Sequence, residues 1–80
     1  MNTQEAVSRR ILELCNQYNL AVGTLSTMSA VPPSTLKNIV NGVTQNPGIV
    51  TIKKLCDALD ITLIDFFNVE MFRDLEPEIK

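Results

Sequence analysis

The sequence contains no histidine, only two cysteines and only three glycines in 80 residues. Without histidine, two cysteines do not make a ligand set for a structural zinc ion. The chain also lacks a nucleophile with a recognisable base, and a glycine-rich phosphate loop after a strand. We therefore expect no enzyme, no metal and no cofactor.

Long apolar runs are also missing. No stretch approaches the roughly 20 apolar residues that a membrane span needs. Residues 1–5 do not show the basic and then apolar pattern of a signal peptide. These absences predict a cytoplasmic protein without a membrane partner. Cys15 and Cys56 fall on apolar helix faces and are expected to fill space in a core, while a disulfide between them stays open.

The residues that are present favour a small helical protein. Apolar residues make up 45% and charged residues 20% of the chain, as in globular proteins. Apolar spacing and turn signals predict an all-α fold with helices at about 3–18, 22–28, 33–41, 49–59 and 63–68. Residues 1–68 then form one domain. Residues 69–80 form an extension that continues helically through Met71 and Phe72 and is either dimerising or partly disordered.

Several residues mark where these helices begin and end. Thr3 is predicted to cap the first helix, and Thr62 the fifth, where Asp65 three positions on completes a capping box. Pro33 suits the first position of the third helix, which needs no amide donor. Gly42 suits a left-handed position directly after its end.

The second and third predicted helices have the spacing of a helix-turn-helix DNA reader. Four apolar residues are expected to fix one helix across the other: Leu25, Val31, Leu36 and Ile39. The outer face of the third helix would then present Ser34, Lys37 and Asn38. This arrangement predicts a reader of double-stranded DNA.

The net charge of -2 hides a strong segregation along the chain. Residues 1–56 hold five basic and two acidic side chains, a balance of +3, whereas residues 57–80 hold two basic and seven acidic ones, a balance of -5. The charge close to the binding surface, and not the net charge of the chain, determines how a protein interacts with a phosphate backbone. The overall acidity therefore does not exclude DNA binding. The acidic end equally fits a purely solubilising role.

Over residues 5–68 the sequence resembles the Cro/cI-type (Xre-like) helix-turn-helix family of phage and bacterial transcription regulators. The residues that carry this resemblance are Arg10-Ile11-Leu12-Glu13-Leu14, Leu20, Leu25, Ala30-Val31, Ser34-Thr35-Leu36, Ile39, Asn41-Gly42, Asn46-Pro47, Ile52, Leu55, Ala58-Leu59 and Ile61-Thr62-Leu63. The resemblance implies a compact five-helix, lambda-repressor-like domain. It also implies a repressor-like regulator that binds operator DNA as a homodimer, with the third helix in the major groove.

The family's DNA contacts carry over to individual positions of this chain. Its base-reading positions correspond to Pro33, Ser34, Lys37 and Asn38. Its DNA backbone positions correspond to Val22, Thr35, Asn41, Thr44, Gln45, Asn46, Lys53 and Lys54. Asparagine can bond adenine, lysine can reach guanine or phosphate, and a proline ring can pack on a thymine methyl. The alternative is that these residues serve as solvated surface, turn and capping residues.

The chain departs from the family pattern at two places. The second helix begins with Ala21, Val22 and Gly23, which supply only backbone amides to a phosphate. Cys15 and Val40 stand where many relatives have a charged pair, and an apolar contact there is physically reasonable.

The apolar residues near the chain end allow two roles. Phe66, Phe67, Met71 and Phe72 form either a dimer interface or a second core layer of the monomer. With so few cations, the second candidate function is a protein-interaction module, such as an antitoxin or adaptor on the same fold.

Overall fold

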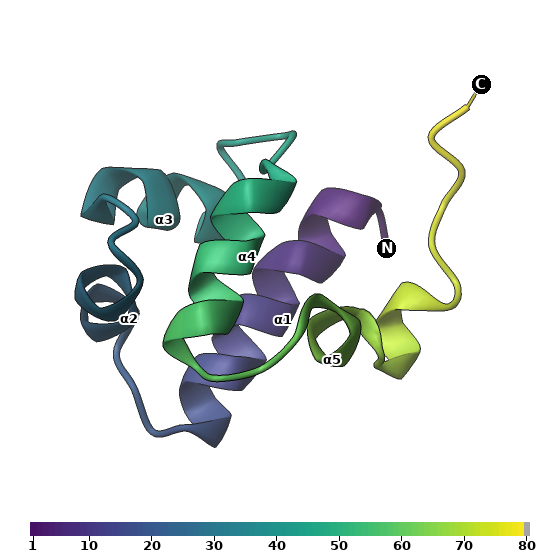
Figure 1. Cartoon of the computed structure of the whole chain (residues 1–80). Coiled ribbons are helices and arrows are strands. Elements are labelled where there is room, and N and C mark those ends of the chain that lie inside the picture. The colour runs from purple at the N-terminus through teal and green to yellow at the C-terminus, as the bar shows by residue number, and fades with distance from the viewer. Residues whose placement is uncertain (80) are drawn as a thin grey trace.

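The computed structural model describes residues 1–79 and confirms the all-α prediction. Its elements are α1 (Thr3–Gln17), α2 (Val22–Ser29), α3 (Pro33–Val40), α4 (Ile49–Ala58), α5 (Leu63–Phe67) and a short 3-10 helix, η1 (Glu70–Phe72). Figure 1 shows α4 in front of α1, with α2 and α3 on one side and α5 and η1 on the other. The five predicted helices begin where these α-helices begin, and each differs from the observed helix by one residue at its end.

The cap of α1 is Asn2 and not Thr3, which corrects the sequence prediction. The Asn2 side-chain oxygen accepts a hydrogen bond from the Glu5 amide at 2.8 Å, and the Glu5 carboxylate accepts one from the Asn2 amide at 3.4 Å. Glu5 lies three positions after Asn2, so only a cap at Asn2 can form this reciprocal pair. Thr3 becomes the first helical residue.

The turn between α2 and α3 is held by two buried serines. Ser26 donates to the Val31 carbonyl at 2.6 Å, and Ser29 donates to the Leu25 carbonyl at 2.7 Å. Ala30, which follows Ser29 at the end of α2, adopts a left-handed conformation with φ +59°. This conformation costs an L residue about 1–2 kcal/mol, so the serine bonds and the buried Val31 offset a local strain.

One apolar core joins all five helices. Its fully buried large side chains are Ile11, Leu25, Leu36, Ile39, Leu55, Cys56 and Phe66. All four residues predicted to fix α2 against α3 belong to this core. Cys15 and Cys56 are free buried thiols, as expected for small core residues, and burial raises the pKa of both.

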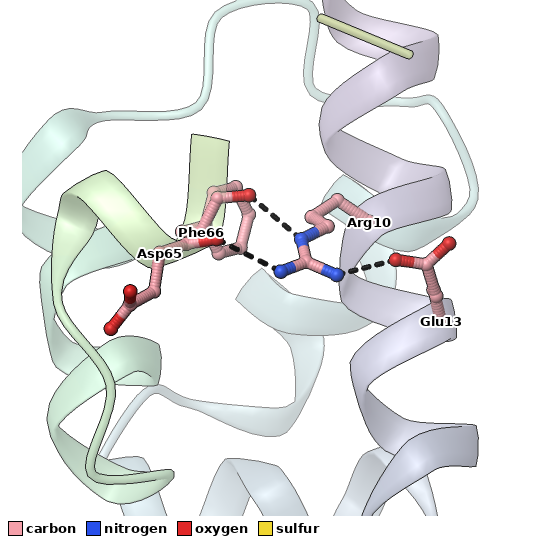
Figure 2. A network of polar contacts seen from close by, with 4 residues as sticks. All are labelled: Arg10, Glu13, Asp65 and Phe66. Atoms are coloured by element: carbon pink, nitrogen blue, oxygen red, sulfur yellow. Dashed lines mark hydrogen bonds and ion pairs between the residues drawn. The ribbon is translucent and has the colours of Figure 1, made fainter. Parts of the chain in front are cut away.

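Both ends of the short helix α5 are fixed by side chains. At its beginning, Thr62 and Asp65 form the predicted capping box, with two hydrogen bonds of 3.0 Å. At its end, the buried guanidinium of Arg10 donates to the carbonyls of Phe66 at 2.7 Å and Asp65 at 2.9 Å, and pairs with Glu13 (Figure 2). Arg10 also lies over the Phe66 ring. A side chain of α1 thereby bonds the last carbonyls of α5.

The phenylalanines near the chain end pack on the monomer. Phe66 is 0% exposed, and the rings of Phe67 and Phe72 lie 4.9 Å and 6.1 Å from its ring. Phe66 therefore has no surface to offer a second chain, which corrects its place in the expected dimer interface. Phe67, Met71 and Phe72 keep partial exposure.

The chain beyond α5 starts again as η1 and does not continue the same helix. Val69 is extended, with φ -135° and ψ 158°, and separates the two helices. Phe72 at the end of η1 packs against the core, so the extension predicted from residue 69 begins attached to the domain. The Glu76 amide then donates to the Met1 carbonyl at 3.2 Å.

Candidate nucleic-acid interface

The outer face of α3 carries the four predicted base-reading residues. Its inner residues Leu36 and Ile39 are buried, which fixes the rotation of the helix. The residues on the outer face, Pro33, Ser34, Lys37 and Asn38, are all exposed. Within residues 1–79 none of their side chains forms a hydrogen bond or an ion pair with the rest of the protein. The structure thus places these side chains together and leaves their polar groups open to a ligand.

Three of the five α-helices begin without a side-chain cap. The residues before α2, α3 and α4 are Ala21, Pro32 and Gly48, and none of them donates or accepts a side-chain cap bond. None of these three helices has an acidic residue in its first turn. Uncapped amides and the positive end of the helix dipole attract phosphate oxygens. The backbone amides at the start of α2, around Val22, are therefore suited to a phosphate contact, which the apolar Val22 side chain cannot make.

The segment after α3 turns sharply. Gly42 has φ +77°, as its predicted left-handed position requires, and the Val43 and Thr44 amides donate to the Asn38 carbonyl at 2.9 Å and 3.1 Å. The Gln45 side chain donates to the Gly42 carbonyl at 2.7 Å, so it takes part in the turn itself.

The predicted backbone contacts differ in accessibility. Val22 and Thr44 are half-buried. The exposed positions are Thr35, Asn41, Gln45, Asn46, Lys53 and Lys54. Asn41 and Asn46 flank the turn, and their side-chain amides form no hydrogen bond within residues 1–79.

The cations near this face are fewer than the sequence balance suggests. Arg10 is buried beneath α5, and Lys53 pairs with Asp57, whose hydrogen bond raises the lysine pKa. Lys37 and Lys54 are exposed and form no ion pair within residues 1–79. The balance of +3 therefore overstates the charge that this surface offers to DNA.

A buried polar link joins α1 to α3. The Ile39 carbonyl accepts hydrogen bonds from Ser8 at 2.6 Å and from Gln4 at 3.1 Å, and both donors are buried. This link brings the exposed Arg9 beside the end of α3. Arg9 was not among the DNA contacts predicted from the sequence. The only sequence signal for a role of Arg9 was its position next to Ser8, on a helix expected to pack against the helix-turn-helix.

The comparisons with known proteins agree with this geometry. The family model described as "Cro/C1-type HTH DNA-binding domain" matches residues 10–71. The chain belongs to the Cro/C1-type helix-turn-helix family of DNA-binding domains. It is also similar to a solved structure titled "Crystal structure of the prophage Lp1 protein 11", with 33% identity and a TM-score of 0.81, over 94% of this chain and 100% of that one. A comparison with curated proteins gives no match.

Membership of the Cro/C1-type family supplies the general function. The chain is a DNA-binding regulatory domain of a kind also found in prophages, from a family of regulators and not of enzymes. Its α2 and α3 are the helix-turn-helix. None of the helices in residues 1–79 has the length and apolar character to cross a membrane.

Proposed function

We propose that this protein is a sequence-specific transcriptional regulator that inserts α3 into the major groove of an operator. The observation that carries the proposal is the outer face of α3, where four exposed side chains have no partner within residues 1–79. Asn38 reads adenine through its amide, and Lys37 reads guanine or contacts a phosphate. Ser34 bonds a base edge, and the Pro33 ring packs on a thymine methyl.

The DNA backbone is held mainly by neutral groups. The uncapped amides of α2 and α4 flank α3, and the Asn41 and Asn46 side chains lie in the segment between α3 and α4. Backbone amides and side-chain amides contact phosphates without adding charge. Thr35, Thr44 and Gln45 complete this set, with Lys54 as its exposed cation and Lys53 shared with Asp57.

The regulator acts as a homodimer in this proposal, because one domain with few cations holds DNA weakly. The apolar residues available for the second chain lie around α5. Ile64 is 78% exposed, and Phe67 and Leu63 are partly exposed beside it. Met71 and Phe72 extend the partly exposed surface along η1. Two domains related by a two-fold axis would then read two half-sites.

Selection of bound sequences from a random DNA pool tests the proposal. We expect a two-fold symmetric consensus, bound by two chains in sedimentation of the complex. By fluorescence anisotropy, Asn38→Ala should lower the preference for the consensus by about 1–3 kcal/mol, whereas Lys54→Ala should weaken binding evenly across sequences. Binding that depends on neither sequence nor salt would refute the proposal and favour a protein-interaction module.

A further inference from the structure

A hollow lies between α1 and the end of α3, next to the turn that follows α3. It has a volume of about 250 Å³. Its lining comes from α1 and from the end of α3: Gln4, Glu5, Ser8, Arg9, Leu12, Val40, Asn41 and Gly42. Asn41 belongs to the segment that the proposed function places on the phosphates, so the hollow opens beside the expected path of the DNA backbone.

Arg9 is the cation of this hollow. It is exposed, and within residues 1–79 its guanidinium makes no hydrogen bond and no ion pair. Its neighbour Arg10 is buried and uses all three of its guanidinium nitrogens on Phe66, Asp65 and Glu13. Two consecutive arginines thus have opposite surroundings, and of the two only Arg9 has an exposed guanidinium without a partner within residues 1–79.

The hollow is held in shape by the link between α1 and α3. Gln4 and Ser8, both part of its wall, bond the Ile39 carbonyl and fix the distance between Arg9 and the end of α3. Gly42 lines the hollow with backbone only, and the turn after α3 lies close to Gln4 of α1 here. A preformed wall reduces the ordering that a long arginine side chain needs on binding.

Glu5 is the acidic member of the lining. Its carboxylate is engaged in the capping box with Asn2 at the start of α1, but it keeps a negative charge near the hollow. This charge opposes an anion and lowers the affinity of the hollow. Glu5→Gln also tests the effect of this charge on binding, because glutamine removes the charge but preserves a capping box at the start of α1.

From these observations we infer that the hollow binds a phosphate of the DNA backbone, held by the Arg9 guanidinium and the Asn41 side-chain amide. The inference rests on the proposed function and extends its backbone contacts to α1. Guanidinium groups bind phosphate oxygens with paired, charge-assisted hydrogen bonds. The contact carries no sequence information and adds one cation to a surface that has few.

The test is the salt dependence of operator binding by the full chain. One phosphate contact contributes about 0.9 to the slope of log K against log salt, a factor of about 3.5 in affinity between 50 and 200 mM. We expect Arg9→Gln to lower the slope by that amount and to weaken binding several-fold at low salt, on all sequences alike. Arg9→Lys should restore most of the slope.

Two further variants complete the design. Glu5→Gln should strengthen binding at low salt, with a gain that fades as salt screens the charge. Arg73→Gln makes the same charge change at a residue that pairs with Glu70 at 3.3 Å, and should leave the slope unchanged. If Arg9→Gln keeps the wild-type slope while Lys37→Gln weakens binding, the assignment of the hollow is wrong and the proposed function stands. If the wild type itself shows no DNA binding, the proposed function fails.

Discussion

The five α-helices of this domain begin in two different ways. α1 and α5 begin with reciprocal capping boxes, Asn2 with Glu5 and Thr62 with Asp65, and each has an acidic residue in its first turn. α2, α3 and α4 have no side-chain cap and no acid there. Stability alone favours capping every helix, because each cap contributes about 1 kcal/mol. The domain thus leaves the first amides uncapped on the three helices that the proposed function places against DNA.

The same division separates the polar side chains. At α5 the polar groups bond to other groups of the protein. The Thr62 and Asp65 side chains form the capping box, and Arg10 donates to backbone carbonyls at the end of the helix. On the outer face of α3, Ser34, Lys37 and Asn38 are exposed and unpartnered within residues 1–79. Variants of α1 and α5 should therefore lose stability, whereas variants of the α3 face should lose DNA binding and keep stability.

The largest expected stability effect is at Arg10. Arg10→Gln removes a buried guanidinium that bonds two carbonyls at the end of α5, and leaves these acceptors without their partner. Loss of hydrogen bonds to a charged group costs about 1.5–3 kcal/mol. The free energy of unfolding, measured by urea titration followed by circular dichroism, should fall by this amount.

Arg9→Gln is the matched control for this change. It removes the same charge one residue earlier, from an exposed side chain without an ion pair within residues 1–79. Its unfolding free energy should stay within about 0.5 kcal/mol of the wild type. Equal losses in the two variants would contradict the division between structural and DNA-facing arginines.

The contrast between these arginines shows how far the sequence could predict the structure. Apolar periodicity and local start and stop signals located the five α-helices, because Pro33, Gly42 and the Thr62–Asp65 pair act locally on the backbone. The role of Arg10 depends on carbonyls more than fifty positions away, which no local pattern reveals. The same holds for Arg9, whose surroundings come from the packing of α1 against α3.

The roles of the terminal phenylalanines were also beyond the sequence. An apolar stretch near a chain end fits a partner surface and a second core layer equally well. The structure places Phe66 in the core, where Arg10 of α1 lies over its ring and donates to its carbonyl. The candidate base-reading residues were easier, since Leu36 and Ile39 must face inward and thereby turn Ser34, Lys37 and Asn38 outward.

A smaller effect is expected at the N-cap of α5. Thr62→Val keeps the shape of the side chain but removes the oxygen that accepts from the Asp65 amide at 3.0 Å. The loss should be about 1 kcal/mol in unfolding free energy. Thr35→Val makes the same change in the first turn of α3, where the hydroxyl has no partner within residues 1–79, and should cost almost nothing. A similar cost at both positions would mean that the open α3 hydroxyl also supports the fold.

The smallest expected effect is that of the Asp65 charge, and it depends on pH. The Thr62 backbone amide, followed by the Thr62 hydroxyl, lowers the pKa of Asp65, with a further contribution from Arg10. A carboxylate with a lowered pKa stabilises the fold fully above its usual pKa of about 3.9, and this contribution is lost as the pH falls through the folded value. Asp65→Asn should thus be less stable than the wild type at pH 7.

The gap between Asp65→Asn and the wild type should narrow as the pH falls below the usual carboxyl pKa of about 3.9, because protonation progressively removes the same charge from the wild type. Urea titrations of both proteins across this range give the measurement, and Asp57→Asn on the exposed pair with Lys53 provides the comparison. A gap that stays constant from pH 7 to pH 3 would show that Asp65 acts through shape and not through its charge. In that case the two kinds of helix beginning would differ in hydrogen bonding alone, and the absence of acidic residues from the first turns of α2, α3 and α4 would have to be explained by the DNA that the proposed function places against them.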